Sequence, residues 1–391
     1  MSGGYGSACR RRRLSASFRR QVKGWLARAW APWLAGGPRL PAGVPSDLQD
    51  LKREPGARIL VIAYPPGLGD TLAVTPFLSA LGELFPAARI SVLAGGEAST
   101  VLARHPAVSE LIRHEDRWIS KDEKRGPRRT PKERRALRDR LRRERFHAVF
   151  DLLGNFFSAR LAASLRSPLR VGYCSGFEAF LTHPVPDRRF QEERMHMARY
   201  HLDLLRHVGL EPGDPPPSVV TGEEEEAFFA DLVRACDLPE RLVGLAPSSA
   251  SPENQWPPRR FAEAADGIVR AAGARGILLG AEGGRPVLDA VAAHMRTAPV
   301  NLCGKTTVLQ AAGVLGHCRC LLTVDTGLMH LGAAVGVKAV ALLRTDSPLW
   351  RPWGEGHRVL AGPLKEGVPG ALRVEDAVRA GEEILEHGDG R

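Results

Sequence analysis

Residues 58–84 read RILVIAYPPGLGDTLAVTPFLSALGEL and predict the first unit of the fold. The run 58–64 is short and apolar, as expected of a buried parallel strand. The Gly/Pro-rich stretch 65–70 predicts a loop, and a helix should follow to about Leu84. A strand, a glycine-rich loop and a helix in this order are typical of an α/β domain.

The same alternation continues along both halves of the chain. In the first half we expect further strands at 89–93, 110–114, 148–152 and 170–173. In the second half we expect strands at 242–246, 275–279, 299–302, 320–324 and 338–343, and helices at 258–272, 285–296, 306–316 and 327–335. Such alternation predicts parallel sheets with right-handed crossovers. Two domains of this kind in tandem favour a ligand site between them, at the carboxyl ends of the strands.

The length of the chain and one linker-like stretch predict the domain boundaries. A chain of 391 residues is too long for one ordinary core. Residues 211–226, EPGDPPPSVVTGEEEE, have the composition of a linker that enters a helix. We therefore expect a basic N-terminal tail and amphipathic helix over 1–50, an N-terminal domain over 51–215 and a C-terminal domain over 216–391.

The charge of the chain predicts an acidic partner. The formal net charge is +11 and the pI is about 9.8, which suits nucleic acid, an anionic membrane surface or phosphorylated substrates. The basic residues concentrate in 10–28 and 117–145. Neither block has the aromatic interleaving of a nucleic-acid stacking platform, so we expect no nucleic-acid partner. The insertion 117–145 is either an acceptor-facing basic surface or a solvated charged helix.

Apolar residues recur at helical spacing from Phe18 to Trp33, with Arg and Lys between them. This pattern is typical of an amphipathic helix on an anionic membrane surface. A packing helix within the protein and a signal peptide are the alternatives, although Arg28 interrupts the apolar stretch and Pro32 breaks it. No apolar run approaches the roughly 18 to 20 residues of a membrane span.

The six cysteines favour reduced thiols in a cytosolic protein, because they show neither a CxxC pair nor a zinc spacing. They are Cys9, Cys174, Cys236, Cys303, Cys318 and Cys320. The last two alternate within an apparent strand, which favours buried side chains over a metal site.

The glycine-rich loop after the first strand is the first candidate binding element. Gly67 and Gly69 let the backbone approach a ligand closely, and the free N–H groups of the next helix suit an anion or a polar sugar. Asp70 stands at the helix start, where a carboxylate also serves as an N-cap. The spacing is neither GxGxxG nor a P-loop, so the loop alone leaves both interpretations open.

The stretch VDTGLMH (324–330) follows an expected strand and opens an expected helix. Gly327 leaves room for a phosphate at the helix N-terminus, and Asp325 or Thr326 can cap it. A carboxylate would repel phosphate, so Asp325 is better suited to orient N–H groups or a hydroxyl. His330 lies about one turn into the helix, on a face that can reach the cleft between the domains, although a lone histidine near a helix start is usually structural. Aspartic proteases share Asp-Thr-Gly but are all-β, which excludes them here.

Two further strand ends carry polar residues. Ser248 and Ser249 follow the strand 242–246 and suit a phosphate or a helix cap, while Glu282 follows the strand 275–279 and suits ribose hydroxyls. Parallel topology places these strand ends on one edge together with Asp325. The combination predicts a site for a ligand that carries phosphate and ribose groups, such as a nucleotide.

Over about residues 57–360 the chain resembles glycosyltransferase family 9, the lipopolysaccharide heptosyltransferases. The matching stretches are RILVIAYPPGLGDTLAVTPFLSAL (58–81), FHAVFDLLGNFFSARLAASL (146–165), RVGY (170–173), GLAPSS (244–249), QWPPRRFAEAAD (255–266), ILLGAE (277–282) and LLTVDTGLMHLGAAVGVKAVALL (321–343). They occur in the family's order and with its spacing. The resemblance implies an α/β fold of the GT-B type, with two Rossmann-like domains whose parallel sheets face a central cleft.

The resemblance also implies the chemistry. The C-terminal domain would bind ADP-L-glycero-D-manno-heptose, and the N-terminal domain would bind the inner core of lipid A. Transfer would invert the anomeric centre without a cofactor or a tightly bound metal. The enzyme would be cytoplasmic and peripheral on the inner membrane.

The resemblance also implies functions for individual residues. Asp70 matches the general base of the acceptor loop that contains Gly67 and Gly69. The donor-binding positions are Ser248 and Ser249 near the diphosphate, Glu282 at the ribose, and Asp325, Thr326, Gly327 and His330 in the donor signature.

One position departs from the family. Asn254 stands where a lysine is expected to neutralise phosphate charge, two residues before the Trp-Pro. Arg259, Arg260 or Arg344 could take over that function. The departure leaves open a transferase with another nucleotide sugar or acceptor, and a non-catalytic sugar- or lipid-binding homologue.

Overall fold

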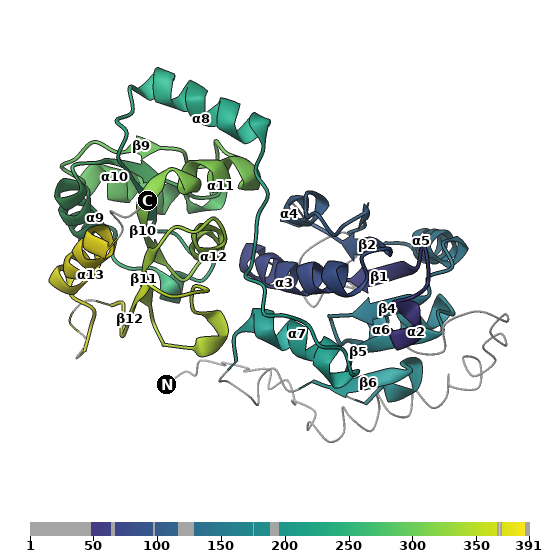
Figure 1. Ribbon diagram of the computed structural model, residues 1–391. Helices are drawn as coiled ribbons and strands as arrows, with labels where there is room; N and C mark the ends of the chain where they lie inside the picture. The colour runs from purple at the N-terminus through teal and green to yellow at the C-terminus, as the bar shows by residue number, and fades with distance from the viewer. Residues whose placement is uncertain are drawn as a thin grey trace, which may run out of the picture.

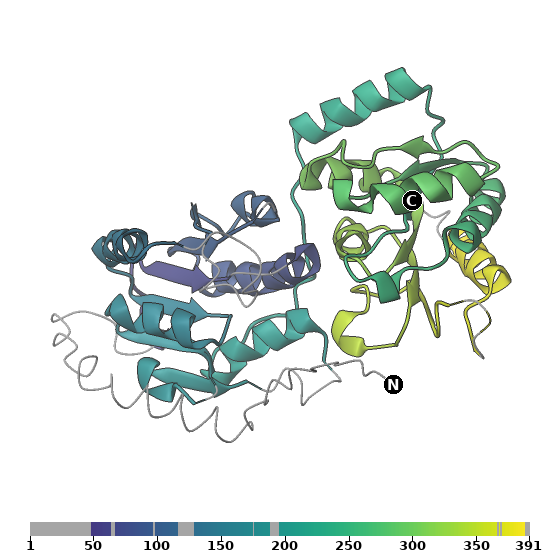
Figure 2. The ribbon, with the colours of Figure 1, turned by 180° about the vertical axis from the view of Figure 1, so that it is seen from behind.

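The computed structural model describes residues 48–63, 67–96, 98–115, 129–174, 176–187, 195–365, 367 and 370–387. Over these residues the chain forms two six-stranded parallel sheets, one in each half, with helices packed against them (Figures 1 and 2). The α/β fold with two parallel sheets is therefore confirmed. The basic tail and amphipathic segment expected within 1–47, and residues 116–128 of the basic insertion, lie outside the described residues.

The first sheet has the strand order β3-β2-β1-β4-β5-β6. Its strands are β1 (Arg58–Ile62), β2 (Arg89–Ala94), β3 (Glu110–Arg113), β4 (Ala148–Asp151), β5 (Leu169–Cys174) and β6 (His183–Pro186). The α-helices of this half are α2 (Leu48–Leu51), α3 (Leu68–Leu84), α4 (Ser99–Ala103), α5 (Pro131–Arg143), α6 (Phe156–Ser164) and α7 (Met197–His207).

The second sheet has the strand order β12-β11-β10-β7-β8-β9. Its strands are β7 (Leu242–Ala246), β8 (Arg275–Leu278), β9 (Val300–Asn301), β10 (Cys318–Val324), β11 (Ala339–Leu343) and β12 (Arg358–Ala361). The α-helices are α8 (Glu223–Cys236), α9 (Pro258–Ala272), α10 (Arg285–His294), α11 (Val308–Gly316), α12 (Gly327–Ala334) and α13 (Val374–His387), and the short 3₁₀ helices η2 (Pro252–Asn254), η3 (Glu282–Gly284) and η4 (Pro348–Trp350) lie between them.

The central strands are largely apolar because both faces of the sheet are covered. In β1, Ile59 and Val61 belong to one buried cluster, and Leu60 and Ile62 belong to another on the opposite face. Alternating side chains of a strand point to opposite faces, so burial on both sides needs a continuous apolar run. This is why such strands were predictable from short windows of sequence.

Several elements were not anticipated. They are β6, β12, α2, α4, α7 and α13. The strand β6 reads HPVP and pairs only at the edge of its sheet, where proline is tolerated, so its sequence does not look like a strand. Helix α3 begins at Leu68, which makes the loop before it shorter than the expected 65–70. The insertion contains α5, whose N-cap Thr130 forms a capping box with Glu133.

Helix α3 carries a proline at its centre, and a threonine compensates for it. Pro76 has no N–H to donate to the carbonyl of Leu72, four residues earlier. The hydroxyl of Thr75 donates to that oxygen instead, at 2.8 Å. The same hydroxyl accepts a hydrogen bond from the backbone N–H of Ser218, at 2.9 Å. The segment between the two sheets is thereby attached to α3.

Two further contacts join the halves of the chain. Leu349, from the loop after β11, is buried in the core cluster of the first sheet. On α4, Arg104 forms ion pairs with Glu225 and Glu224 of α8, at 2.5 and 3.0 Å. Burial alone would raise the pKa of Glu225, but the Gly222 N–H and the Arg104 guanidinium hold it below its usual value. Glu225 is therefore a buried carboxylate that depends on a cation from the other half.

Cys318 and Cys320 are both buried in β10, as expected. A shift in register between them places Cys318 in one core cluster and Cys320 in the cluster on the opposite face. Burial raises the pKa of the Cys320 thiol to about 12, which makes it inert as a nucleophile or ligand. Within the described residues, no helix is both long and apolar enough to cross a membrane.

Candidate functional site

The N-termini of α3 and α12, which carry the two predicted motifs, lie against each other. A Cβ added to Gly69 would lie 2.6 Å from Cδ2 of His330. A Cβ added to Gly327 would lie 2.7 Å from Cβ of Leu68. Both distances are shorter than real Cβ contacts, so glycine permits the close approach of the two helices at each point. Each helix follows the carboxyl end of a central strand, β1 or β10, so these edges of the two sheets meet here.

Asp70 is the third residue of α3, and the N-cap position belongs to Gly67. The carboxylate turns back toward the start of the helix, since its Oδ2 lies 3.3 Å from the position that a Cβ of Gly67 would take. An acidic residue in the first turn is favoured by the helix dipole. The interpretation of Asp70 as the N-cap residue is therefore wrong. Asp70 is half-buried beside Gly69, which touches the other half of the chain.

Asp325 follows β10 and makes a hydrogen bond with the residue that replaces the expected lysine. The amide Nδ2 of Asn254 donates to Oδ2 of Asp325 at 2.8 Å. Burial raises the pKa of Asp325, and the charge of Arg344 acts in the opposite direction. Asn254 thus orients the carboxylate without neutralising it. Thr326 is the N-cap residue of α12, but its side chain makes no capping hydrogen bond. Its hydroxyl can therefore bind a ligand.

The other predicted donor residues follow the two strands next to β10. Ser248 and Ser249 come after β7, and a Cβ added to Gly284 would lie 2.5 Å from Oγ of Ser248. The Oγ of Ser249 accepts from the N–H of Ser251 at 3.3 Å, and its carbonyl accepts from Gln255 at 2.9 Å. Since β10, β7 and β8 are neighbours in the sheet, their polar strand ends share one edge.

Glu282 stands at the end of β8, in η3, and is held by an arginine. Its two carboxylate oxygens accept from Nε and Nη2 of Arg285, at 2.6 and 2.5 Å. Nη2 also donates to the carbonyl of Cys303 at 3.0 Å. The hydrogen bonds from Arg285 lower the pKa of Glu282, which therefore stays ionised. A fixed, ionised carboxylate on this edge can accept hydrogen bonds from vicinal hydroxyls such as those of ribose.

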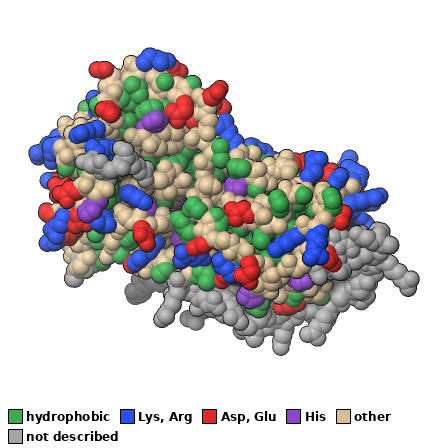
Figure 3. All heavy atoms as spheres, in the orientation of Figure 1, with side chains coloured by type: hydrophobic (Ala, Val, Ile, Leu, Met, Phe, Trp, Pro, Cys, Tyr) green, Lys and Arg blue, Asp and Glu red, His purple; other side chains and the backbone are tan. Residues whose placement is uncertain are grey.

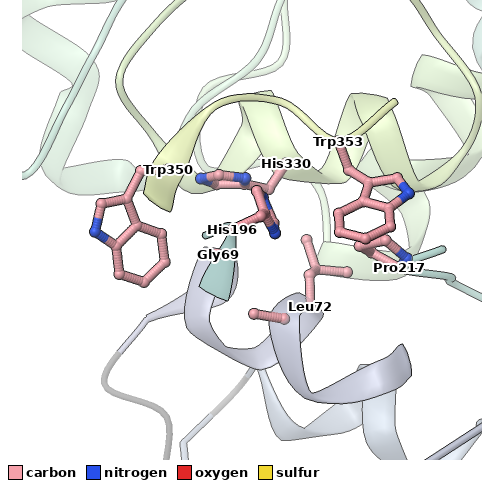
Figure 4. Close-up of a pocket in the computed structure, with 8 residues that line it drawn as sticks. Gly69, Leu72, His196, Pro217, His330, Trp350 and Trp353 are labelled. Atoms are coloured by element: carbon pink, nitrogen blue, oxygen red, sulfur yellow. The ribbon is translucent and has the colours of Figure 1, made fainter. Parts of the chain in front are cut away.

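A small hollow between the two halves lies beside this edge (Figure 4). Its walls are Gly69, Leu72, Ala73, His196, Pro217, His330, Trp350 and Trp353. It contains Gly69 and His330 of the predicted site but neither Ser248 nor Glu282. The hollow is therefore part of the packing between the halves and is separate from the donor edge.

The rings around the hollow join α7 to the loop after β11. Nδ1 of His196 accepts from the N–H of Ala198, so Nε2 carries the proton and donates to the carbonyl of Arg351, at 3.1 Å. The ring of His196 lies 4.9 Å from that of Trp353, and Arg199 lies over Trp353 at 5.1 Å. The sequence did not single out these residues. The pair of tryptophans in LWRPWG (349–354) was the available signal.

Because several histidines are buried, we expect the fold to lose stability at acidic pH. Burial lowers the pKa of His105 to about 4, of His196 to about 4 and of His330 to about 3. In the unfolded chain these groups return to about 6.5, so below that pH the unfolded state binds more protons. We expect the free energy of unfolding to fall as pH is lowered from 6.5 toward 4, with each histidine contributing up to about 1.4 kcal/mol per pH unit.

Urea unfolding measured at pH 7.0 and 5.5 tests this expectation. His105→Gln should reduce the loss of stability between the two values, because it removes one buried proton acceptor away from the predicted site. Exposed His207→Gln is the matched control and should leave the loss unchanged. Equal losses in the wild type and in His105→Gln would contradict the expectation.

The structure thus gathers the predicted residues into two groups. Gly67, Gly69 and Asp70 lie at the start of α3, against Gly327 and His330. Asp325 and Thr326, Ser248 and Ser249, and Glu282 follow three neighbouring strands of the second sheet. Sequence reasoning did not find Arg285, which holds Glu282, or the bond between Asn254 and Asp325. A bond between residues 71 positions apart has no local signal.

Two parallel α/β sheets whose carboxyl ends meet at helix N-termini define the GT-B fold. Two of the solved structures that share this fold match most of this chain. A glycosyltransferase of family 9 from Veillonella parvula has a TM-score of 0.74 and 24% identity, over 85% of this chain and 98% of the other. ADP-heptose LPS heptosyltransferase II of Escherichia coli has a TM-score of 0.70 and 23% identity, over 85% of this chain and 100% of the other.

The sequence assigns the chain to a family of proteins with this fold. The model of the family described as glycosyltransferase family 9 (heptosyltransferase) matches residues 134–367, more than half of the chain. The chain therefore belongs to glycosyltransferase family 9. Lipopolysaccharide heptosyltransferase 2 of Salmonella typhimurium is 27% identical over 311 residues, which cover 75% of this chain and 85% of the relative. Lipopolysaccharide heptosyltransferase 3 of Escherichia coli is 22% identical over 297 residues, which cover 73% and 83%.

Proposed function

We propose that this glycosyltransferase moves heptose from ADP-heptose to the inner core of lipopolysaccharide, with inversion at the anomeric carbon. The observation that carries the proposal is the contact of α3 with α12 at Gly69 and Gly327, which brings the acceptor loop of one half to the donor motif of the other. The names of the relatives support heptose and lipopolysaccharide. A structure of similar fold, the Escherichia coli heptosyltransferase WaaC, holds ADP and supports the nucleotide.

In this proposal the donor lies along the carboxyl edge of the second sheet. The diphosphate lies at the N-terminus of α12, where Gly327 leaves the backbone accessible, and near Ser248 and Ser249. Ionised Glu282 binds the ribose hydroxyls. Asp325 and Thr326 orient the sugar, and His330, buried and neutral, supports the contact between the halves.

The reaction is a single displacement. Asp70 accepts the proton of the acceptor hydroxyl as its oxygen attacks the anomeric carbon. The bond from that carbon to the diphosphate oxygen breaks, and the charge of the departing nucleotide is stabilised by the N–H groups of α12. The division into an acceptor domain over 51–215 and a donor domain over 216–391 belongs to the same proposal.

The enzyme is proposed to act at the cytoplasmic face of the inner membrane, on a lipid A–core acceptor. Helix α5 supports an anionic partner, since Lys and Arg side chains gather where it lies (Figure 3). Some of these charges are balanced, as in the pairs Arg129–Glu133 and Arg140–Glu110. Lys132, Arg143 and Arg145 are exposed and have no ion pair among the described residues, so they are available to phosphate groups.

Product analysis tests the proposed function. The enzyme is incubated with lipid A–core acceptor in membranes and with ADP-heptose, ADP-glucose, UDP-glucose or GDP-mannose in turn. We expect transfer from ADP-heptose, with a product of inverted anomeric configuration. Transfer from a different donor would identify a family-9 transferase of other specificity, which Asn254 makes a real alternative. No transfer from any donor would favour a non-catalytic binding protein.

A further inference from the structure

The proposed donor edge needs a positive charge that its polar residues do not supply. A nucleoside diphosphate is anionic and gains further charge as the glycosidic bond breaks. Asp325 adds a carboxylate to the same edge, and its partner Asn254 is neutral. The helix dipole of α12 amounts to roughly half a unit charge. The edge therefore requires a full positive charge beside Asp325.

The basic residues near this edge are mostly occupied elsewhere. Arg259 pairs with Glu263 on its own helix at 3.0 Å. Arg260 donates to the carbonyl of Leu372 at 3.2 Å and lies over the ring of Trp256. Arg259 and Arg260, which could have replaced the missing lysine, are thus engaged with other groups.

Three other cations either form an ion pair with a carboxylate or lie farther from Asp325 along the edge of the sheet. Arg285 holds Glu282, and Arg351 pairs with Asp346 within its own loop. Lys305 follows β9, which is three strands away from β10, a distance of about 14 Å at the usual strand spacing. None of the three stands beside Asp325.

Arg344 has the required position. It directly follows β11, which pairs with β10 in parallel, with Val324 opposite Leu342. Asp325 and Arg344 are the first residues after these two neighbouring parallel strands, so they lie at the same edge of the sheet. Its side chain is exposed and has no ion pair or hydrogen bond among the described residues. Burial raises the pKa of the Asp325 carboxyl, and the positive charge of Arg344 acts against that rise.

We propose that Arg344 is the cation that binds the diphosphate of the donor, while Asn254 orients Asp325 through a neutral hydrogen bond. The family's lysine is expected after β7, at the position of Asn254. In this chain the cation follows β11 instead, on the other side of β10 and Asp325. A guanidinium suits this task because its fixed N–H groups can bind two phosphate oxygens at once. The inference rests on the proposed function, since it assigns a ligand contact within the same donor site.

Calorimetric titration with ADP and with adenosine tests the inference. Arg344→Gln should weaken ADP about 10- to 100-fold, because a charge-assisted bond to phosphate is lost. Adenosine has no phosphate, so its affinity should not change. Arg259→Gln, which alters an exposed arginine already paired with Glu263, is the matched control and should bind ADP like the wild type. Thermal unfolding of each variant checks that the fold is retained.

A second variant separates charge from shape. Asn254→Lys in the Arg344→Gln background returns a cation to the opposite side of Asp325 and should recover most of the lost ADP affinity. Unchanged ADP affinity in Arg344→Gln, or an equal loss for adenosine, would overturn the assignment of Arg344 while leaving the proposed function in place. A wild-type protein that binds none of ADP, UDP and GDP would contradict the proposed function itself, and the inference with it.

Discussion

Asp70→Ala is expected to lower kcat by about 10²- to 10⁴-fold while the affinity for ADP stays within a factor of two or so, because a general base contributes on this scale and ADP binds the other half of the chain. The change removes the only carboxylate in the first two turns of α3. Steady-state transfer rates and calorimetric titration with ADP provide the two measurements. Asp70→Asn, which keeps the shape but cannot accept a proton, should lose kcat to a similar extent.

The matched control lies on the same helix. Glu83→Ala removes an exposed carboxylate from the last turn of α3 and should leave both kcat and ADP affinity unchanged. If Asp70→Ala weakens ADP as much as it slows transfer, Asp70 is not the base. Its carboxylate then stabilises the start of α3 and, through Gly69, the contact with α12.

Gly69→Val is expected to lower kcat by about 100-fold. A Cβ at this position would already collide with Cδ2 of His330, and valine adds two methyl groups to it. The starts of α3 and α12 must then separate by an ångström or so, and a displacement of that size between reacting groups costs about two orders of magnitude. The expected loss lies in kcat more than in the affinity for ADP, since the donor edge itself is unchanged.

A double-mutant cycle shows whether the collision is the cause. In the His330→Ala background the ring is absent, so Gly69→Val should cost much less than in the wild type. Gly316→Ala, at the end of α11, is the control, because a Cβ there meets nothing within 4 Å. An equal cost of Gly69→Val in both backgrounds would mean that the valine acts within α3 alone and that the contact with His330 is not important.

Much of the fold was predictable from the sequence, because each central strand is a short apolar run that can be recognised locally. The runs that became β1, β7 and β10 are largely apolar, since both faces are buried. The edge strand β6 was not predicted, because prolines interrupt it, and an edge tolerates them. Helix α3 was predicted despite Pro76, although most of its residues are buried on several sides and give it little amphipathic character.

The site was predictable in part for the same reason. Polar residues directly after parallel strands must share an edge, so Ser248, Glu282 and Asp325 could be grouped without a structure. The contact between Gly69 and His330 could not be predicted, since it depends on how the two halves pack. The acid–amide pair of Asn254 and Asp325 likewise depends on the folded path of the chain after β7.

The attachment of Ser218 to Thr75 has a consequence for the energetics of substrate binding. The hydroxyl that compensates for Pro76 also holds the connecting segment, so the chain between the sheets is ordered along the helix that carries Asp70. Ordering such a segment during binding would consume part of the interaction energy of the substrates. Here that entropy is lost during folding. The two halves are preorganised, and more of the binding energy remains for lowering the barrier of the transfer step.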